Sequence, residues 1–141
     1  MKYYIIVASK DHVQAGIEEG IAQAGHGKKT QLARLDKNDW VIYYSSKDKY
    51  ENGKSFQKFT AIGQVEDSEP YKVTVNPNFE PWRRKINYYS SKHLEIRPLL
   101  DDLNFITNRK RWGLHLMSGF IEIEKSDFKL IAEKMLTHKK L

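Results

Sequence analysis

Residues 25–45 read GHGKKTQLARLDKNDWVIYYS and hold two features from which the rest of the chain is interpreted. The first is a glycine-flanked histidine followed by lysines. Glycine permits positive φ and a close approach of backbone to a ligand, so His26, Gly27 and Lys28 are interpreted as one rim of a pocket. The alternative for His26 is a polar loop residue that bonds only nearby backbone. The second feature is the aromatic run Trp40–Tyr44, which predicts a strand that forms the pocket floor.

Side-chain alternation makes this strand a central one. One face would carry Trp40, Ile42 and Tyr44, and the other Val41, Tyr43 and Ser45. Large residues on both faces predict a strand that is buried from both sides. The polar residues 46–55, which include Asn52-Gly53, predict a mobile surface loop after it.

The remaining hydrophobic periodicities predict the other elements. Strands are expected over residues 3–8, 56–65, 71–75, 81–89 and 119–123, and helices over residues 11–24, 95–105 and from Ser126 onward, with a helical turn within 108–117. In the strand expected over residues 56–65, Phe59 and Ala61 should lie on the same face. The last helix should bury Phe128, Ile131, Ala132 and Met135. Gly16 and Gly20 either weaken the first helix or let it pack closely on the sheet.

The order of these elements predicts the fold class. Strands follow one another and helices lie at the edges, which favours an α+β fold with a strongly curved mixed sheet or pseudo-barrel and flanking helices. A doubly wound parallel sheet is not expected, because helices and strands do not alternate.

Length and composition indicate one folded domain over residues 1–141. Cysteine is absent, which excludes disulfides, thiolate catalysis and cysteine-based zinc sites. The first apolar run, Tyr3–Ala8, is too short for the core of a signal peptide, and no run approaches the roughly 18 apolar residues of a membrane span. We therefore expect a cytoplasmic protein that does not interact with membranes.

The chain is basic, with a net charge of +6 and a pI near 9.4. A basic balance favours nucleic acid as a partner, although many small proteins carry such a charge for solubility alone. The basic clusters are Lys28–Lys29, Arg83–Lys85 and Arg109–Arg111. Their convergence on one face would favour nucleic acid, and their scatter would disfavour it.

Catalytic and metal-binding motifs are lacking in the sequence. There is no GxSxG elbow, no GxxxxGK[ST] loop and no HxH or HExxH pair. The histidines are dispersed along the chain, at His12, His26, His93, His115 and His138. We expect no metal, no cofactor and no catalytic activity.

Aromatic residues are interleaved with the basic clusters, which favours binding. Trp82 precedes Arg83 and Arg84, and Trp112 follows Arg109–Arg111. An aromatic ring beside cations can stack on a base while the cations hold phosphate. The alternative, that these rings fill the core, is favoured for Trp40, Phe59 and Tyr71, whereas for Trp82 both interpretations stay open.

Read together, these segments resemble an EVE domain, a branch of the PUA-like superfamily. The matching segments are VASKDH (7–12), GIAQ (20–23), HGK (26–28), DWVIYYS (39–45), QKFTAIG (57–63), PWRR (81–84), LNFI (103–106) and WG (112–113). They follow one another in order over nearly the whole chain. In two places the chain departs from the pattern: Ile21 and Trp82 stand where the family commonly has Phe, and the second departure affects the expected wall of the pocket.

The resemblance implies a PUA-like fold and a binding role without catalysis. Related YTH and SRA domains hold a flipped, modified base in an aromatic-lined pocket, and EVE domains are regarded as similar readers of modified bases in DNA or RNA. Carried over to this chain, the expected ligand-binding residues are Ser9, Lys10, His26, Gly27, Lys28, Tyr44, Ser45, Trp82, Arg83, Arg84, Ile106 and Trp112.

The resemblance also implies roles for some of these residues. Trp82 is the expected stacking wall, and Ser9 and Ser45 are expected to bond the base edge. Phosphate or sugar contacts are expected from Lys28, Arg83 and Arg84.

Two other functions stay open. One is a small hydrolase of a modified nucleoside, in which Lys10 or Lys28 would be the base if desolvation lowered its pKa. The other is an ordinary PUA-type RNA-binding module, whose affinity for folded RNA would not depend on a pocket.

Overall fold

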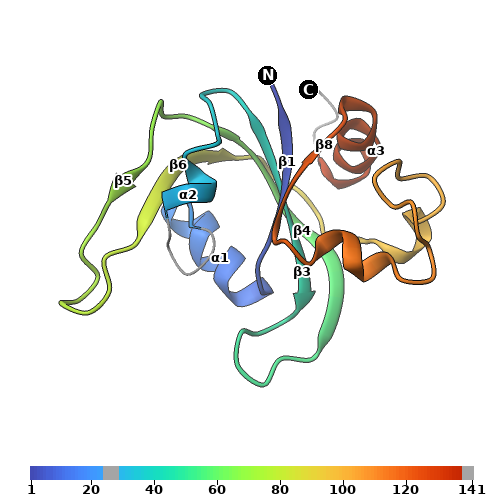
Figure 1. Cartoon of the computed structure of the whole chain (residues 1–141), viewed down its shortest axis with the longest axis horizontal. Helices are drawn as coiled ribbons and strands as arrows, with labels where there is room; N and C mark the ends of the chain where they lie inside the picture. Colours follow the sequence, from blue (N-terminus) through green and yellow to red (C-terminus); the bar gives the residue numbers. More distant parts are fainter. Residues whose placement is uncertain (24–28, 138–141) are drawn as a thin grey trace.

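The computed structural model describes residues 1–23 and 29–137 (Figure 1). Its strands form an eight-stranded sheet in the order β2-β6-β4-β3-β1-β8, with β5 paired to β6 and β7 to β4. The elements in chain order are β1 (Tyr3–Val7), α1 (Lys10–Glu19), β2 (Ile21–Ala22), α2 (Lys29–Leu32), β3 (Trp40–Lys47), β4 (Ser55–Val65), β5 (Tyr71–Lys72), β6 (Trp82–Tyr88), β7 (Leu94–Glu95), the 3₁₀ turns η2 (Arg97–Leu99) and η3 (Trp112–Leu116), β8 (Phe120–Ile123) and α3 (Lys125–Met135).

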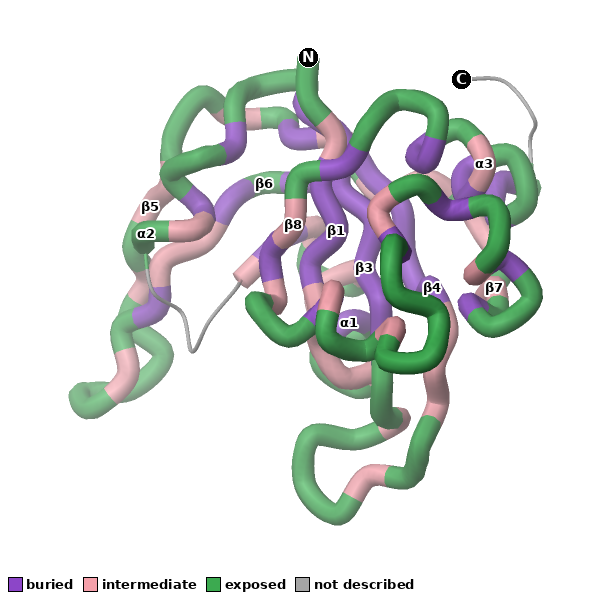
Figure 2. Tube along the Cα trace, turned by 45° about the vertical axis from the view of Figure 1, so that its right-hand side comes forward, coloured by how far each residue is buried: buried purple, intermediate pink, exposed green. Residues whose placement is uncertain are grey.

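The centre of the sheet is β3, as the sequence predicts. It pairs in parallel with β1 and antiparallel with β4, and its residues from Trp40 to Ser45 are all buried. The buried parts of the chain converge on β1, β3 and β4, while the β3–β4 hairpin and the arm that carries β5 are largely exposed (Figure 2). The expected α+β class with a strongly curved mixed sheet is confirmed.

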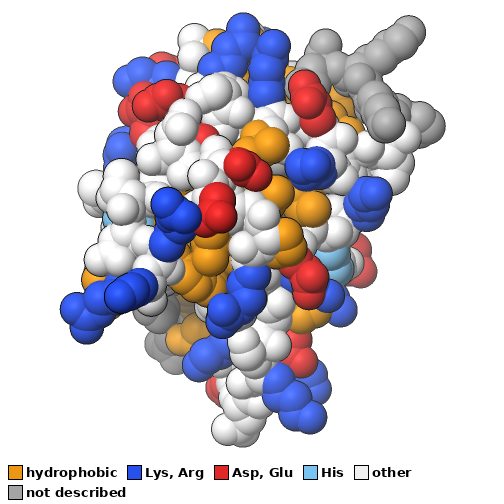
Figure 3. Space-filling model, turned by 90° about the vertical axis from the view of Figure 1, so that its right-hand side faces the viewer, with side chains coloured by type: hydrophobic (Ala, Val, Ile, Leu, Met, Phe, Trp, Pro, Cys, Tyr) orange, Lys and Arg blue, Asp and Glu red, His pale blue; other side chains and the backbone are white. Residues whose placement is uncertain are grey.

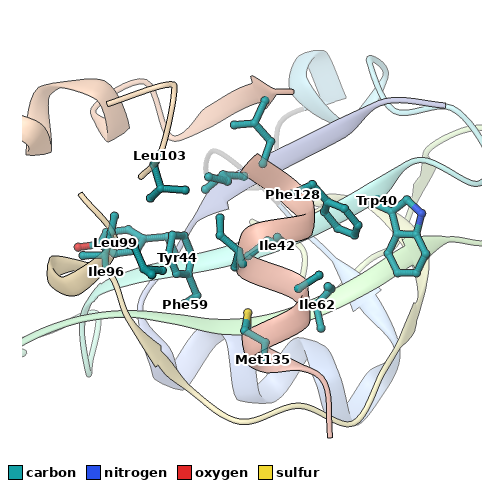
Figure 4. Packing of buried hydrophobic residues seen from close by; sticks show 14 of the residues in the cluster. Trp40, Ile42, Tyr44, Phe59, Ile62, Ile96, Leu99, Leu103, Phe128 and Met135 are labelled. Carbon is teal, nitrogen blue, oxygen red and sulfur yellow. The ribbon is translucent and has the colours of Figure 1, made fainter. Parts of the chain in front are cut away.

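Each face of the sheet has its own hydrophobic core. On one face α3 packs over β3 and β4, and Figure 4 shows Phe128 and Met135 of this helix in the same cluster as Ile42 and Ile62. The predicted apolar stripe of α3 is confirmed, because its members are all buried. On the other face α1 and α2 contribute Val13, Leu32 and neighbouring residues to a second core. In residues 1–23 and 29–137, no helix is long and apolar enough to cross a bilayer.

A β-bulge in β4 corrects the predicted faces of this strand. Tyr43 is opposite Ala61, whereas Tyr44 is opposite Phe59, so Thr60 is an extra residue in the ladder. A bulge shifts the alternation by one residue. Phe59 therefore lies in the core under α3 and Ala61 in the opposite core, and not on one face as predicted.

The first helix is shorter than predicted. It ends at Glu19, because Gly20 adopts φ 67° and donates its N–H to the carbonyls of Gly16 and Ile17, as a left-handed helix cap does. The next residues form β2, which pairs with β6. The expected helix over residues 11–24 is thus wrong beyond residue 19.

Two further segments are less regular than predicted. In place of the helix expected over residues 95–105, the structure has the end of β7 at Glu95 and the 3₁₀ turn η2, and the strand expected over 71–75 is regular only at Tyr71–Lys72. The second segment lies in an arm where Val75 is 52% exposed, so little packing holds a longer strand in place.

Candidate functional site

A cavity of about 590 Å³ lies between α1 and the curved sheet. Its walls come from the end of β1, one side of α1, β2, β3 and β6, and from two loops. Four aromatic residues line it, namely Tyr43, Tyr50, Phe79 and Tyr88. Because these residues come from distant parts of the chain, only the folded sheet brings them together.

Two tyrosine hydroxyls contribute to the polar lining of the cavity, to which Ser9, Glu19 and Gln23 also belong. Tyr88 donates a hydrogen bond of 2.7 Å to the carbonyl of Ile21, and the hydroxyl of Tyr43 is buried near Tyr88 and the backbone of Gln23. Burial raises the pKa of Tyr43 to about 12 and the pKa of Tyr88 well above its usual value. Both hydroxyls are therefore protonated at neutral pH and act as hydrogen-bonding groups there, not as bases.

One rim of the cavity is tied together by Asp11. Its Oδ1 accepts hydrogen bonds from the hydroxyl of Ser9 at 2.5 Å and from the N–H groups of His12 and Tyr50 at 2.9 and 3.2 Å. Burial alone would raise the pKa of Asp11, but these hydrogen bonds outweigh it and lower the pKa. Asp11 thereby fixes the β3–β4 loop to the start of α1.

The hydrogen bonds of Asp11 bring two exposed aromatic rings together. The ring of Tyr50 stacks on the imidazole of His12, with ring centroids 5.0 Å apart and an interplanar angle of 18°. Tyr50 is 57% exposed, although it also lines the cavity. The pair offers a flat apolar surface at the mouth of the cavity.

The opposite rim carries a cation. Arg83 of β6 is half-buried, and its Nε donates a hydrogen bond of 3.0 Å to Oε1 of Gln23, which also lines the cavity. A guanidinium has five N–H donors, so this contact orients Arg83 and leaves donors for a ligand.

Gly16 lets α1 lie close to this wall. A Cβ at this position would lie 2.9 Å from the carbonyl oxygen of Ile21 and 3.7 Å from the hydroxyl of Tyr88. The first distance is shorter than real Cβ contacts, so any larger residue would push α1 away from β2. Of the two roles expected for Gly16, the structure therefore supports close packing on the sheet.

The structure brings two of the expected site residues, Ser9 and Arg83, to the cavity. His26, Gly27 and Lys28 lie outside the described residues. The cavity walls further contain Tyr43, Tyr50, Tyr88 and His12, which were not among the site residues expected from the sequence. The alternation in β3, which places Tyr43 opposite to Tyr44, is the signal that could have pointed to one of them.

Arg84 has a structural role, which corrects its assignment as a phosphate contact. It is fully buried, and its Nε lies 2.6 Å from Oδ1 of Asp67. Its Nη1 donates to the carbonyls of Leu32 and Leu35, so the guanidinium anchors α2 and the following turn to β6. Its donors are already used inside the protein.

Trp82 also lies away from the cavity. Its half-buried ring packs on the core under α1, with the ammonium groups of Lys29 and Lys72 lying 4.7 and 6.0 Å from its centroid. The expected stacking wall is therefore absent from the cavity, and Tyr50 with His12 supplies the aromatic surface at its mouth.

The remaining expected residues do not line the cavity either. Tyr44 and Trp112 lie on the α3 side, with ring centroids 6.4 Å apart, and Ile106 is buried in the same core. The hydroxyl of Ser45 is buried and bonded to that of Thr60 at 2.8 Å. The ammonium of Lys10 lies over the ring of Phe56 at 5.4 Å.

Two of the three basic clusters lie on different sides of the molecule, so these clusters do not converge on one face as a nucleic-acid-binding surface would favour. Arg83–Lys85 lies in β6, whereas Arg109–Arg111 precedes η3 on the other side of the molecule (Figure 1). On that side, basic, acidic and apolar side chains are intermixed (Figure 3), and Arg109 forms an ion pair with Asp101 at 2.8 Å. Within the described ranges, no group of three His, Asp or Glu residues is placed to hold a metal ion.

Comparisons with known proteins agree with this architecture. The family model of the EVE domain matches residues 2–134. A UPF0310 protein of Mycolicibacterium vanbaalenii is 43% identical, over 97% of this chain and 94% of its own, and one of Mycobacterium avium is 42% identical, over 96% and 98%.

Solved structures show the same fold at low identity. A Rhodopseudomonas palustris protein solved by NMR superposes with a TM-score of 0.55 at 12% identity, covering 95% of this chain and 92% of its own. A hypothetical protein from Leishmania major gives a TM-score of 0.54 at 10% identity, with 94% and 93% covered.

Proposed function

This chain belongs to the EVE domain family, and on that premise we propose that it binds nucleic acid and holds one modified base, turned out of its strand, in the cavity beside α1. The PUA-like fold is consistent with a nucleic-acid-binding module. The observation that carries the proposal is the cavity itself, which combines aromatic walls, neutral hydroxyls and a cation at its rim.

The size and lining of the cavity suit a base. Its volume of about 590 Å³ falls within the range of roughly 300–1,000 Å³ found for small-molecule sites. The carboxamide NH2 of Gln23 offers donors for a base edge, and the hydroxyl oxygens of Tyr43 and Tyr88 offer acceptors. Val13 and Ile21 add apolar wall, against which an alkyl substituent on the base would be buried.

The mouth of the cavity suits the extruded nucleotide. Turning a base out of the stack costs a few kcal/mol, and stacking on an aromatic side chain returns about 1–3 kcal/mol per base. The exposed pair of Tyr50 and His12 provides such a surface. Arg83 on the other rim is placed to meet phosphate or sugar, in a chain whose net charge is +6.

We propose binding without catalysis. The tyrosine hydroxyls remain protonated at neutral pH, because burial raises their pKa values. Of the two lysines that the hydrolase hypothesis offers as the base, Lys10 does not line the cavity, and Lys28 lies outside the described residues. These observations favour a reader over a hydrolase.

The test is a titration at fixed salt with oligonucleotides of one sequence. The set contains the unmodified strand and strands with a single 5-methylcytosine, 5-hydroxymethylcytosine or N6-methyladenine. We expect one modified strand to bind about tenfold or more tightly than the unmodified strand, a difference of about 1.4 kcal/mol. Tyr50→Ala and Arg83→Ala should weaken this binding, whereas Lys129→Ala, an exposed residue of α3, should not. Equal affinity for all strands, unchanged by Tyr50→Ala, would refute the proposal.

A further inference from the structure

A second group of cations lies next to the cavity rim. The ammonium groups of Lys10 and Lys58 lie 5.4 and 4.7 Å from the ring centroid of Phe56. The same ring meets the imidazole of His93 edge-on, with centroids 5.5 Å apart. We call these four residues the Phe56 cluster. They come from α1, from the start of β4 and from the segment before β7, and all are half-buried.

The backbone that carries the cluster is held in an unusual conformation. Gln57, between Phe56 and Lys58, adopts φ 53°, which is uncommon for a residue other than glycine. Its carbonyl accepts the N–H of Ile96 at 3.2 Å, and its side-chain oxygen accepts Nε of Arg97 at 2.8 Å. Residues in such conformations persist only where their surroundings fix them, and they concentrate at functional sites.

The two lysines of the cluster carry positive charge, and Glu95 is the register partner of Lys58 in the ladder between β4 and β7. Within the part of the chain that the structure describes, the ion pairs are Lys2–Glu122, Arg84–Asp67 and Arg109–Asp101. Neither Lys10 nor Lys58 takes part in one. Burial, together with the charges of these two lysines, lowers the pKa of His93, so the imidazole is neutral at pH 7.

The Phe56 cluster is joined directly to the rim of the cavity. Lys10 follows Ser9, which lines the cavity, and precedes Asp11, whose carboxylate holds the backbone of Tyr50. The N–H of Asp11 is also bonded to the carbonyl of Asp48, in the hairpin between β3 and β4. The position of the two lysines is thus fixed relative to the mouth of the cavity.

We propose that the Phe56 cluster binds the phosphodiester backbone of the strand beside the extruded base. The inference rests on the proposed function of the cavity and extends it along the strand. Lysine ammonium groups act as point charges for phosphate. Phe56 holds both of them by cation–π contacts, which reduces the freedom they lose on binding.

The experiment compares three variants of the full chain. K10Q/K58Q removes both cations of the cluster, and F56L keeps the cations but removes the ring. The control K125Q/K129Q removes two exposed lysines from α3, on the opposite face of the sheet. Each is titrated with the preferred modified oligonucleotide over a range of salt concentrations, with the corresponding modified nucleoside, which carries no phosphate, and with inorganic phosphate.

The expected outcome separates strand binding from base binding. K10Q/K58Q should reduce the salt slope by about 1–2, since each neutralised phosphate contributes roughly 0.7–0.9, and its affinity for the oligonucleotide should fall about tenfold or more at low salt. Affinity for the nucleoside should stay unchanged. F56L should show a smaller loss of oligonucleotide affinity, and the control should retain the slope of the original protein.

The imidazole of His93 gives an independent readout by NMR. A bound phosphodiester offsets the charges of Lys10 and Lys58, so the oligonucleotide should raise the pKa of His93 in the original protein and raise it less in K10Q/K58Q. The nucleoside should leave the pKa of His93 unchanged.

Three results would overturn the inference. They are a salt slope of K10Q/K58Q equal to that of the control, no change of the His93 pKa on addition of oligonucleotide, and binding of inorganic phosphate at the cluster as tight as that of the oligonucleotide. The last would indicate a site for a free anion. Failure of the cavity proposal can be told apart from failure of this inference. If the cavity does not bind a modified base, all strands bind equally well, but the salt slopes of K10Q/K58Q and the control still show whether the cluster binds the strand.

Discussion

The two faces of the sheet enclose aromatic side chains in different ways. Beneath α3 the rings pack on one another, as Tyr44 does edge-on against Phe59 with centroids 5.6 Å apart. Beneath α1 the rings of Tyr43 and Tyr88 instead line a cavity of about 590 Å³. The rings beneath α3 thus fill a packed core, while those beneath α1 line a space that has room for a ligand.

Residues that are adjacent in the sequence can likewise have different surroundings and different roles. Arg83 and Arg84 are adjacent in β6, yet Arg83 reaches the cavity and Arg84 is sealed inside by Asp67 and α2. Alternation along the strand sends the two side chains to opposite sides. What each then does depends on partners supplied from elsewhere in the chain.

The largest expected contrast is between alanine variants of these two arginines. Arg84→Ala should lower the free energy of unfolding by about 3–5 kcal/mol, because it removes the buried guanidinium that pairs with the half-buried carboxylate of Asp67 and with three backbone carbonyls. Arg83→Ala should lower it by about 1 kcal/mol, the contribution of one hydrogen bond. Urea unfolding, followed by circular dichroism, measures both. Equal losses would show that Arg83 is also structural.

A pair of glycines provides the second contrast. Gly16→Ala should cost about 1–3 kcal/mol by overpacking and should weaken ligand binding, since α1 must move away from the carbonyl of Ile21. The matched variant Gly113→Ala adds a Cβ in η3 where no atom lies within 4 Å, so it should be neutral or slightly stabilising. Thermal unfolding with and without ligand checks this. Normal binding by Gly16→Ala would show that the cavity does not depend on this close approach.

The pH dependence tests burial on both faces at once. Burial raises the pKa of Tyr43, and also that of Tyr44, to about 12, while a tyrosine in the unfolded chain ionises near about 10. The unfolded chain loses its protons first, so stability from these groups is intact below about pH 10 and falls as the pH rises towards about 12. Urea midpoints between pH 8 and pH 11, compared with Tyr43→Phe/Tyr44→Phe, measure the effect. Because burial also raises the pKa of Tyr88, the double variant should still lose some stability in this range. A fall as large as that of the original protein would contradict the prediction.

Much of the fold could be predicted from periodicity alone. The alternation in Trp40–Tyr44 and the stripe from Phe128 to Met135 each depend on local spacing, and both are confirmed. The bulge at Thr60 could not be predicted, because it inserts a residue without a turn signal. Gly20 did carry a signal for the end of α1, since glycine is the usual left-handed helix cap.

The site was less predictable because its members come from distant segments. Tyr43 and Tyr88 are far apart in sequence and meet only through β4, which lies between β3 and β6. The burial of Arg84 depends on Asp67 and on the carbonyls that follow α2, which no local pattern reveals. The pattern of aromatic residues next to basic residues in the sequence therefore did not predict where the cavity lies.

The central claim is that the cavity on the α1 face, and not the core on the α3 face, takes the base. The most direct measurement is an amide NMR titration with the free nucleoside whose strand binds best. The account predicts saturable shifts at Ser9, His12, Tyr50 and Arg83, with little change along η3 and α3. Saturable shifts confined to η3 and α3, or none up to the solubility limit of the nucleoside, would contradict it.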